Sequence, residues 1–271
     1  MAGIALDHRL AGSGEPLLLI HGIGSTWRVW KPVLGRLEAS HEVLAVDVPG
    51  FGHSAALPTG ATPTIAAMAD ALEQALDAVG WQQPHVAGNS MGGWLALELG
   101  RRGRAASVVA ISPAGMWTEK ERVYSRNALR AQHAIATRIA PYADRITSTA
   151  LGRTLVLGSV MSRPWRLEPE HAAETLRLFA GCPGWATTLE ALTGDMPREL
   201  GSIECPVRIA WGTRDTLLLP RQADRFVREI PGAQLARLPG LGHVPMGDDP
   251  EAVSDSILEF TARHARDKTP A

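Results

Sequence analysis

The sequence predicts an α/β fold in which a mostly parallel sheet is flanked by helices and carries a helical insertion. Three observations predict it: short apolar runs bounded by glycine or proline, helical patterns between those runs, and one long stretch of helical patterns without a strand. Strands that are covered on both faces read as continuous runs rich in Val, Ile and Leu. Their alternation with helices is typical of a parallel sheet with crossover helices.

Six apolar runs are the predicted strands, at residues 17–20, 43–46, 85–87, 107–111, 207–211 and 235–238. Two stretches between them, 65–79 and 91–100, repeat apolar residues every three or four positions, which predicts helices with one buried face.

The alternation stops after about Trp117. Residues 119–180 show consecutive helical patterns interrupted by prolines, and the run at 207–211 then resumes the strand pattern. We therefore expect a sheet core formed by residues 1–115 and 197–271, and a helical cap formed by residues 116–196.

Charge and composition restrict the partners. With 27 Lys and Arg against 28 Asp and Glu, the net charge of -1 exerts no bulk attraction on nucleic acid or anionic membrane, so a small molecule is the expected ligand. The first residues lack a signal-peptide pattern, and no apolar stretch is long enough to span a membrane. Cys182 and Cys205 belong to no paired motif and are expected to be free thiols, which suits the cytoplasm. The sequence leaves a homodimer open.

The segment Gly88-Asn89-Ser90-Met91-Gly92 lies where the strand at 85–87 meets the helix that starts at 91. A nucleophile on so sharp a turn adopts strained backbone angles, and side chains beside it would collide with the strand and helix, which explains the glycines. Ser90 is therefore the candidate nucleophile. The alternative is a glycine-rich turn with an incidental serine.

Backbone donors are expected near Ser90. The N–H of Met91 opens a helix, and the N–H of Ile23 follows His21-Gly22 after the first strand, so both can face a developing oxyanion. A dinucleotide-binding pattern starting at Gly22 is a weaker alternative, because Trp27 occupies its last glycine position.

A serine needs a base, and the base needs an orienting carboxylate. His243 lies in a loop after the strand at 235–238, and Asp215 follows the strand at 207–211, so both face the edge where Ser90 is displayed. Asp195 and Asp47 are weaker candidates for the carboxylate. The order Ser90, Asp215, His243 is the one that strand–elbow–helix hydrolases show.

Together these motifs resemble the α/β-hydrolase family, in its serine-nucleophile branch with a helical cap. The resemblance covers nearly the whole chain: 21–24 resembles the oxyanion loop, 47–54 the D-x-P-G-x-G-x-S segment, 88–92 the nucleophile elbow, 211–215 the acid loop and 242–243 the histidine loop. It implies an eight-stranded, mostly parallel sheet and an acyl-enzyme mechanism on Ser90 without metal or cofactor. Ser90 argues against dehalogenases and epoxide hydrolases of this fold, which use an aspartate.

The expected substrate is a small to medium, largely apolar carboxylic ester. Four tryptophans, Trp27, Trp94, Trp117 and Trp185, are the expected pocket walls, although ordinary core packing is an alternative for each. Two other functions remain open. The elbow is similar to that of hydrolases that cleave carbon–carbon bonds in ring-fission diketones, but Val244 follows His243 where those commonly have tryptophan. A non-catalytic ligand-binding protein could also retain these motifs.

Overall fold

The computed structural model of the chain describes residues 5–265. They form one sheet whose strands are β1 (His8–Gly12), β2 (Glu15–Ile20), β3 (His41–Val46), β4 (His85–Asn89), β5 (Ser107–Ile111), β6 (Val207–Gly212) and β7 (Gln234–Leu238). The order across the sheet is β1-β3-β2-β4-β5-β6-β7. β1 is antiparallel to β3, and the other neighbouring strands are parallel.

The mostly parallel sheet is confirmed, and each of the six predicted runs lies in one of β2 to β7. The strand count differs from the eight that the resemblance implied, because only one antiparallel strand, β1, precedes the parallel ones in the described chain. β1 has the sequence HRLAG and is mostly exposed, so it carries no apolar run that could have predicted it.

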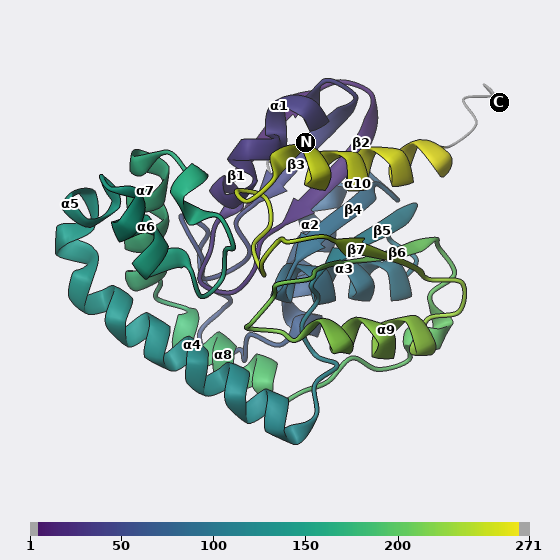
Figure 1. Ribbon diagram of the computed structural model, residues 1–271. Coiled ribbons are helices and arrows are strands. Elements are labelled where there is room, and N and C mark those ends of the chain that lie inside the picture. The colour runs from purple at the N-terminus through teal and green to yellow at the C-terminus, as the bar shows by residue number, and fades with distance from the viewer. Residues whose placement is uncertain (1–4, 266–271) are drawn as a thin grey trace.

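Helices cover both faces of the sheet (Figure 1). The core helices are α1 (Lys31–Glu38), α2 (Ile65–Ala78), α3 (Met91–Arg101), α9 (Ala223–Glu229) and α10 (Pro250–Arg263). Successive strand residues point to opposite faces, so Leu18 and Ile20 pack in the cluster with α2, α3 and α9, whereas Leu17 and Leu19 pack in the cluster with α1 and α10. The core is therefore two apolar layers on a covered sheet.

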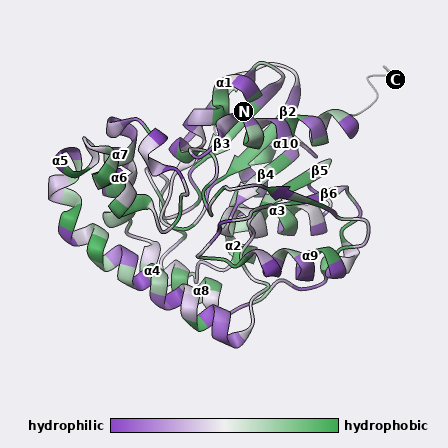
Figure 2. Cartoon of the chain, in the orientation of Figure 1, coloured by the Kyte–Doolittle hydropathy of each residue, from purple (hydrophilic) through white to green (hydrophobic). Residues whose placement is uncertain are grey.

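The segment between β5 and β6 is helical. It contains α4 (Glu119–Ile139), α5 (Ala143–Thr147), α6 (Ala150–Leu157), α7 (Pro169–Ala180) and α8 (Trp185–Thr193). These helices gather on one side of the sheet in Figure 1. Hydrophobic and hydrophilic residues alternate along α4 in Figure 2, as expected of a helix with one packed face. We call residues 116–196 the cap segment.

The start of the cap segment is attached to the core through a buried carboxylate. Glu121 closes a capping box with Thr118 at the start of α4 and accepts hydrogen bonds of 2.6 Å from both Arg221 and Arg225. Although burial alone would raise the pKa of Glu121, the hydrogen bonds from Arg225, Thr118 and Arg221 lower it to about 2. The carboxylate is thus ionised at neutral pH and holds α4 to the region of α9.

Two further expectations concern the described residues. Cys182 and Cys205 are both free, and burial raises the pKa of each thiol to about 11, so neither is a thiolate at neutral pH. None of the helices between residues 5 and 265 is both long and apolar enough to cross a lipid bilayer.

Candidate active site

Ser90 occupies a strained turn between β4 and α3. Its φ and ψ are 59° and −116°, a conformation that non-glycine residues rarely adopt. A Cβ at Gly88 would lie 2.0 Å from the carbonyl oxygen of Gly92, and one at Gly92 would lie 2.2 Å from that of Ile20. The turn is held because the Ser90 N–H donates to the carbonyl of Ile111 at 2.9 Å. The glycines of the motif are therefore required by sterics.

His243 and Asp215 form a buried pair. The imidazole Nδ1–H donates to Asp215 Oδ2 at 2.7 Å, and both side chains are nearly inaccessible to water. Asp215 Oδ1 accepts the N–H groups of Leu217 and Leu218 at 2.9 and 2.8 Å. This arrangement fixes the histidine tautomer that leaves Nε2 free to accept a proton.

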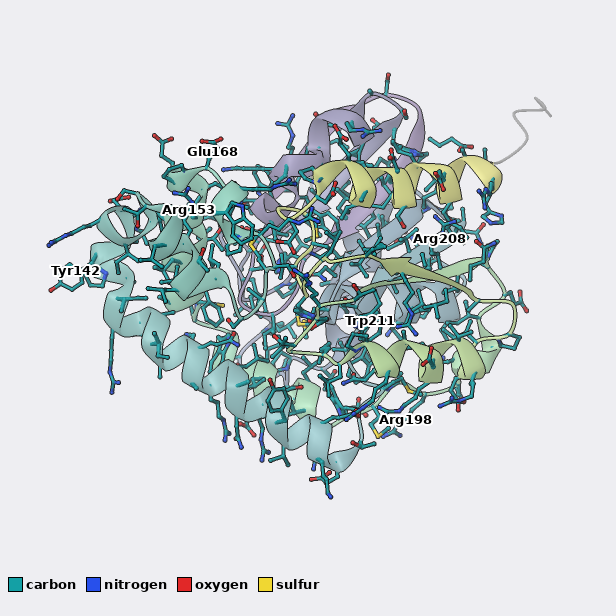
Figure 3. The ribbon with its side chains drawn as sticks, in the orientation of Figure 1. Tyr142, Arg153, Glu168, Arg198, Arg208 and Trp211 are labelled. Carbon is teal, nitrogen blue, oxygen red and sulfur yellow. The ribbon has the colours of Figure 1, made fainter. Side chains whose placement is uncertain are left out.

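The loop that carries Asp215 is also held in place by Trp211. Trp211 at the end of β6, labelled in Figure 3, is completely buried, and its indole N–H donates to the carbonyl of Leu218 at 3.1 Å. The two rival carboxylates lie elsewhere. Asp195 accepts hydrogen bonds from Met196 and Arg198 at the end of the cap segment.

Asp47 instead organises the loops beside Ser90. Its carboxylate accepts the N–H groups of Trp27 at 2.6 Å and His53 at 3.2 Å, and a Cβ at Gly52 would lie 1.8 Å from Asp47 Oδ2. Burial raises the pKa of Asp47 to about 6. The pattern of the D-x-P-G-x-G-x-S segment thus has a structural cause. The Asp47 carboxylate accepts N–H groups from two neighbouring turns, and it leaves no space for a side chain at position 52.

The loop after β2 lies directly opposite Ser90. A Cβ at Gly22 would lie 3.1 Å from Ser90 Cβ, so a side chain here would crowd the nucleophile. His21 is fully buried and supports the loop, since its Nδ1–H donates to the Gly22 carbonyl at 2.7 Å and its Nε2 accepts the Val48 N–H at 3.0 Å. Burial lowers the pKa of His21 to about 4, so the ring is neutral at pH 7.

The two expected oxyanion donors come from different parts of the chain. Met91 is the first residue of α3, so its N–H has no acceptor within the helix. Ile23 lines the same cavity as Ser90. Both N–H groups are thus candidates for stabilising negative charge beside Ser90 Oγ.

That cavity has a volume of about 300 Å³. Ser90 and His243 line its base, and residues of α4, α6 and α7 line its upper part, so the cap segment covers the carboxyl edge of the sheet. No hydrogen bond joins Ser90 Oγ to His243 among the described residues; catalytic hydrogen bonds are often long before substrate binds. A ligand in this cavity would meet both groups.

The four tryptophans expected as pocket walls are not among the described residues that line this cavity. Trp94 and Trp117 pack edge to face in the main core cluster. Trp27 donates its indole N–H to Asp7, away from the cavity. Trp185 stacks on a cap histidine, His133, at 4.1 Å. The expectation is not met, because these large rings fill the space beneath and beside the pocket.

The aromatic side chain that lines the cavity instead is Phe179 of α7. It packs edge to face with Trp185, and a Cβ at Gly24 would lie 2.4 Å from its ring. The oxyanion loop therefore contacts the cap segment at Gly24, where φ is +72°.

Two positioning residues were missed by sequence reasoning. The first is Asn89, whose buried Nδ2 donates to the carbonyl of Ile111 at 3.1 Å and to that of His243 at 2.9 Å. It therefore links the nucleophile turn to the histidine loop. Its place beside Ser90 in the motif was the only available signal, since that position of the motif accepts any residue.

The second is Asp248, whose fully buried carboxylate accepts three backbone N–H groups. They are those of Gly242 at 2.8 Å, Ser162 at 2.9 Å and Arg163 at 2.6 Å. The sequence showed an acidic residue five positions after His243, but not that it reaches the cap segment.

Comparison with known proteins identifies a family. A family model described as "Alpha/beta hydrolase family" matches residues 17–256. Epoxide hydrolase EphH of Mycobacterium tuberculosis is 33% identical over 202 residues, which cover 72% of this chain and 94% of that protein. RutD of Variovorax paradoxus, for which carbamate hydrolysis has been proposed, is 31% identical over 276 residues, which cover 95% of this chain and 96% of RutD.

Among solved structures, a thermophilic esterase from Thermogutta terrifontis superposes with a TM-score of 0.73 at 23% identity, covering 96% of this chain and 94% of the esterase. At that identity the likeness shows the fold alone.

Proposed function

This chain belongs to the alpha/beta hydrolase family, and we propose that it is a serine hydrolase that cleaves a largely apolar carboxylic ester through an acyl-enzyme. One observation carries the proposal: Ser90 and His243 line the same cavity, and His243 Nδ1 is hydrogen-bonded to Asp215. This is the set of nucleophile, base and orienting acid that acyl transfer needs.

The reaction follows from the geometry. His243 Nε2 takes the proton of Ser90 Oγ as the oxygen attacks the ester carbonyl carbon, and the N–H groups of Ile23 and Met91 bind the resulting oxyanion. His243 then gives the proton to the leaving alcohol. In the second half, water loses a proton to His243 and attacks the acyl carbon, and His243 returns that proton to Ser90 Oγ as the carboxylic acid leaves.

The name of EphH raises epoxide hydrolysis as an alternative for this chain. The identity of residue 90 argues against it. Attack of a serine oxygen on an epoxide carbon leaves an ether, which water does not readily cleave, whereas attack by an aspartate leaves a hydrolysable ester. Cleavage of a carbon–carbon bond next to a ketone and a non-catalytic ligand-binding role are the other two candidates.

Labelling of the intact, folded protein by a fluorophosphonate tests the proposal. We expect wild-type protein to gain one covalent adduct by mass spectrometry and Ser90→Ala to gain none. Rates with 4-nitrophenyl acetate, a carbamate, a styrene-type epoxide and a vinylogous diketone then separate the candidate reactions. Folded wild-type protein that neither labels nor hydrolyses the ester would overturn the proposal.

A further inference from the structure

The cavity above Ser90 opens to solvent between two cap helices. Ile135 of α4 and Leu155 of α6 both line the cavity, yet they are 56% and 76% exposed. Leu151, one turn earlier on α6, is 69% exposed. The rim of the mouth therefore carries apolar side chains from both helices.

The interior of the cavity is uncharged. No Asp, Glu, Lys or Arg is found among the described residues that line it. Its upper walls are mainly aliphatic, with Leu129 and Ile139 from α4 and Leu176 from α7, and the polar side chains that these two helices contribute are those of Gln132, His171 and Thr175. A carboxylate or ammonium group inside would lose its hydration without gaining a counter-ion, so the cavity favours a neutral apolar group.

We propose, resting on the proposed function, that the substrate is an ester with a medium to long aliphatic acyl chain. The chain extends from Ser90 through the cavity and emerges between Ile135 and Leu155. The acyl group, rather than the alcohol, occupies this path because it remains bonded to Ser90 Oγ while water replaces the alcohol. The exposed leucines then contact the outer part of the chain.

A series of 4-nitrophenyl esters from the acetate to the laurate tests this chain path. We expect kcat/KM to rise about fourfold for each methylene that the cavity buries, and then to level off as further carbons pass the mouth. A closed pocket would instead give a sharp fall beyond its capacity. A fall from the acetate onward would overturn the proposal.

The variant Leu155→Asp is a second test, since it places a charge at the mouth of the cavity, where the outer part of a long acyl chain would lie. We expect its loss of kcat/KM to be about tenfold larger for the decanoate than for the acetate. The matched control is Leu235→Asp, an exposed leucine on β7 that is outside the cavity lining; it should change neither rate. Equal losses for both esters in Leu155→Asp would contradict the chain path. Failure of the enzyme proposal is distinct, because no ester would then react and no label would form.

An independent observation concerns how His243 is held. Asp248 accepts N–H groups from Gly242, the residue before His243, and from Ser162 and Arg163 of the cap segment. On the other side, the N–H of Val244 donates to the carbonyl of Val160 at 2.8 Å. The residues on both sides of His243 are therefore bonded directly or through one carboxylate to residues 160–163.

We infer that Asp248 is a positioning residue that places His243 only when the cap segment is docked. The histidine loop and the cap segment are in close contact here, since a Cβ at Gly242 would lie 2.9 Å from the Ser162 nitrogen. An amide at position 248 would replace one accepting oxygen by a donor facing an N–H group. That mismatch would displace the Gly242–His243 peptide and hence the base.

Asp248→Asn tests this inference, with Asp255→Asn, an exposed carboxylate on α10, as control. We expect kcat for 4-nitrophenyl acetate to fall about 100-fold, as for a small misplacement of a catalytic group, with KM changed less than about threefold. Active sites are counted by fluorophosphonate, so that unfolded protein is excluded, and the acid limb of the kcat pH profile should shift. Asp248→Glu should restore part of kcat. A kcat within twofold of wild type and an unchanged pH profile would overturn the inference.

Discussion

The sheet core and the cap segment differ in the side chains that they place around the cavity and in how those side chains are bonded. In the core, the groups beside Ser90 have fixed partners: Asp215 accepts from two backbone N–H groups, and His21 is bonded at both ring nitrogens. In the cap segment, the residues that reach the cavity are mainly aliphatic, and Ile135 and Leu155 are exposed. Under the proposed function, the core loops hold the reacting groups, whereas the cap helices line the path to them and are joined to the histidine loop through Asp248.

The largest effects should come from the core. Ser90→Ala and His243→Ala should each lower kcat for 4-nitrophenyl acetate about 10⁴-fold or more, because the reaction loses its nucleophile or its base. Steady-state rates measure the loss, and thermal unfolding by circular dichroism controls for the fold. Activity within tenfold of wild type for either variant would show that the substituted residue does not act in the reaction.

Asp215→Asn should follow, with a loss in kcat of about 10³- to 10⁴-fold, because an amide would favour the wrong histidine tautomer. The same rate assay measures it. Near-full activity would mean that another carboxylate orients His243, and Asp195→Asn would be the next variant.

Stability should separate the two regions as well. Leu19→Ala, at a fully buried position of β2, should lower the free energy of unfolding by about 4 kcal/mol. Leu176→Ala should lower it by about 2 kcal/mol, because Leu176 already borders a cavity and its removal forms little new empty space. Urea unfolding measures both, and equal losses would show that the cavity beside Leu176 does not reduce the cost of removing its side chain.

The last prediction concerns the pH dependence of stability and His21. Its folded-state pKa of about 4 lies below the ordinary 6.5, so the unfolded chain binds the proton first as pH falls. The His21 contribution to stability is complete above pH 6.5 and declines toward pH 4. The stability gap between wild type and His21→Gln should therefore narrow by about 1.4 kcal/mol per pH unit within that window.

Urea unfolding of both proteins at several pH values measures this gap. The raised pKa of Asp47 gives the opposite pH dependence, with stability lost as pH rises toward 6, but Asp47 is present in both proteins and cancels in the difference. A gap that is constant from pH 6.5 to 4 would show that His21 does not titrate in this way.

Much of the core could be predicted because its signals are local. The runs that became β2 to β6 are mostly buried and rich in Val, Ile, Leu and Ala, since both faces of these strands are covered. β7 is mostly exposed, and its run includes Arg237. A side chain at Gly88 or Gly92 would collide with backbone. β1 escaped prediction because an exposed edge strand needs no apolar run.

By itself, the sequence determined the α/β class, the helical nature of the cap segment and the candidates Ser90, Asp215 and His243, because each depends on local patterns and on which strand end a residue follows. Only the tertiary structure decided which residues line the cavity. The four tryptophans pack elsewhere, while Phe179, Asn89 and Asp248 contribute through contacts between segments far apart in the chain. Such contacts leave no periodicity in the sequence, because they depend on how the cap docks on the sheet.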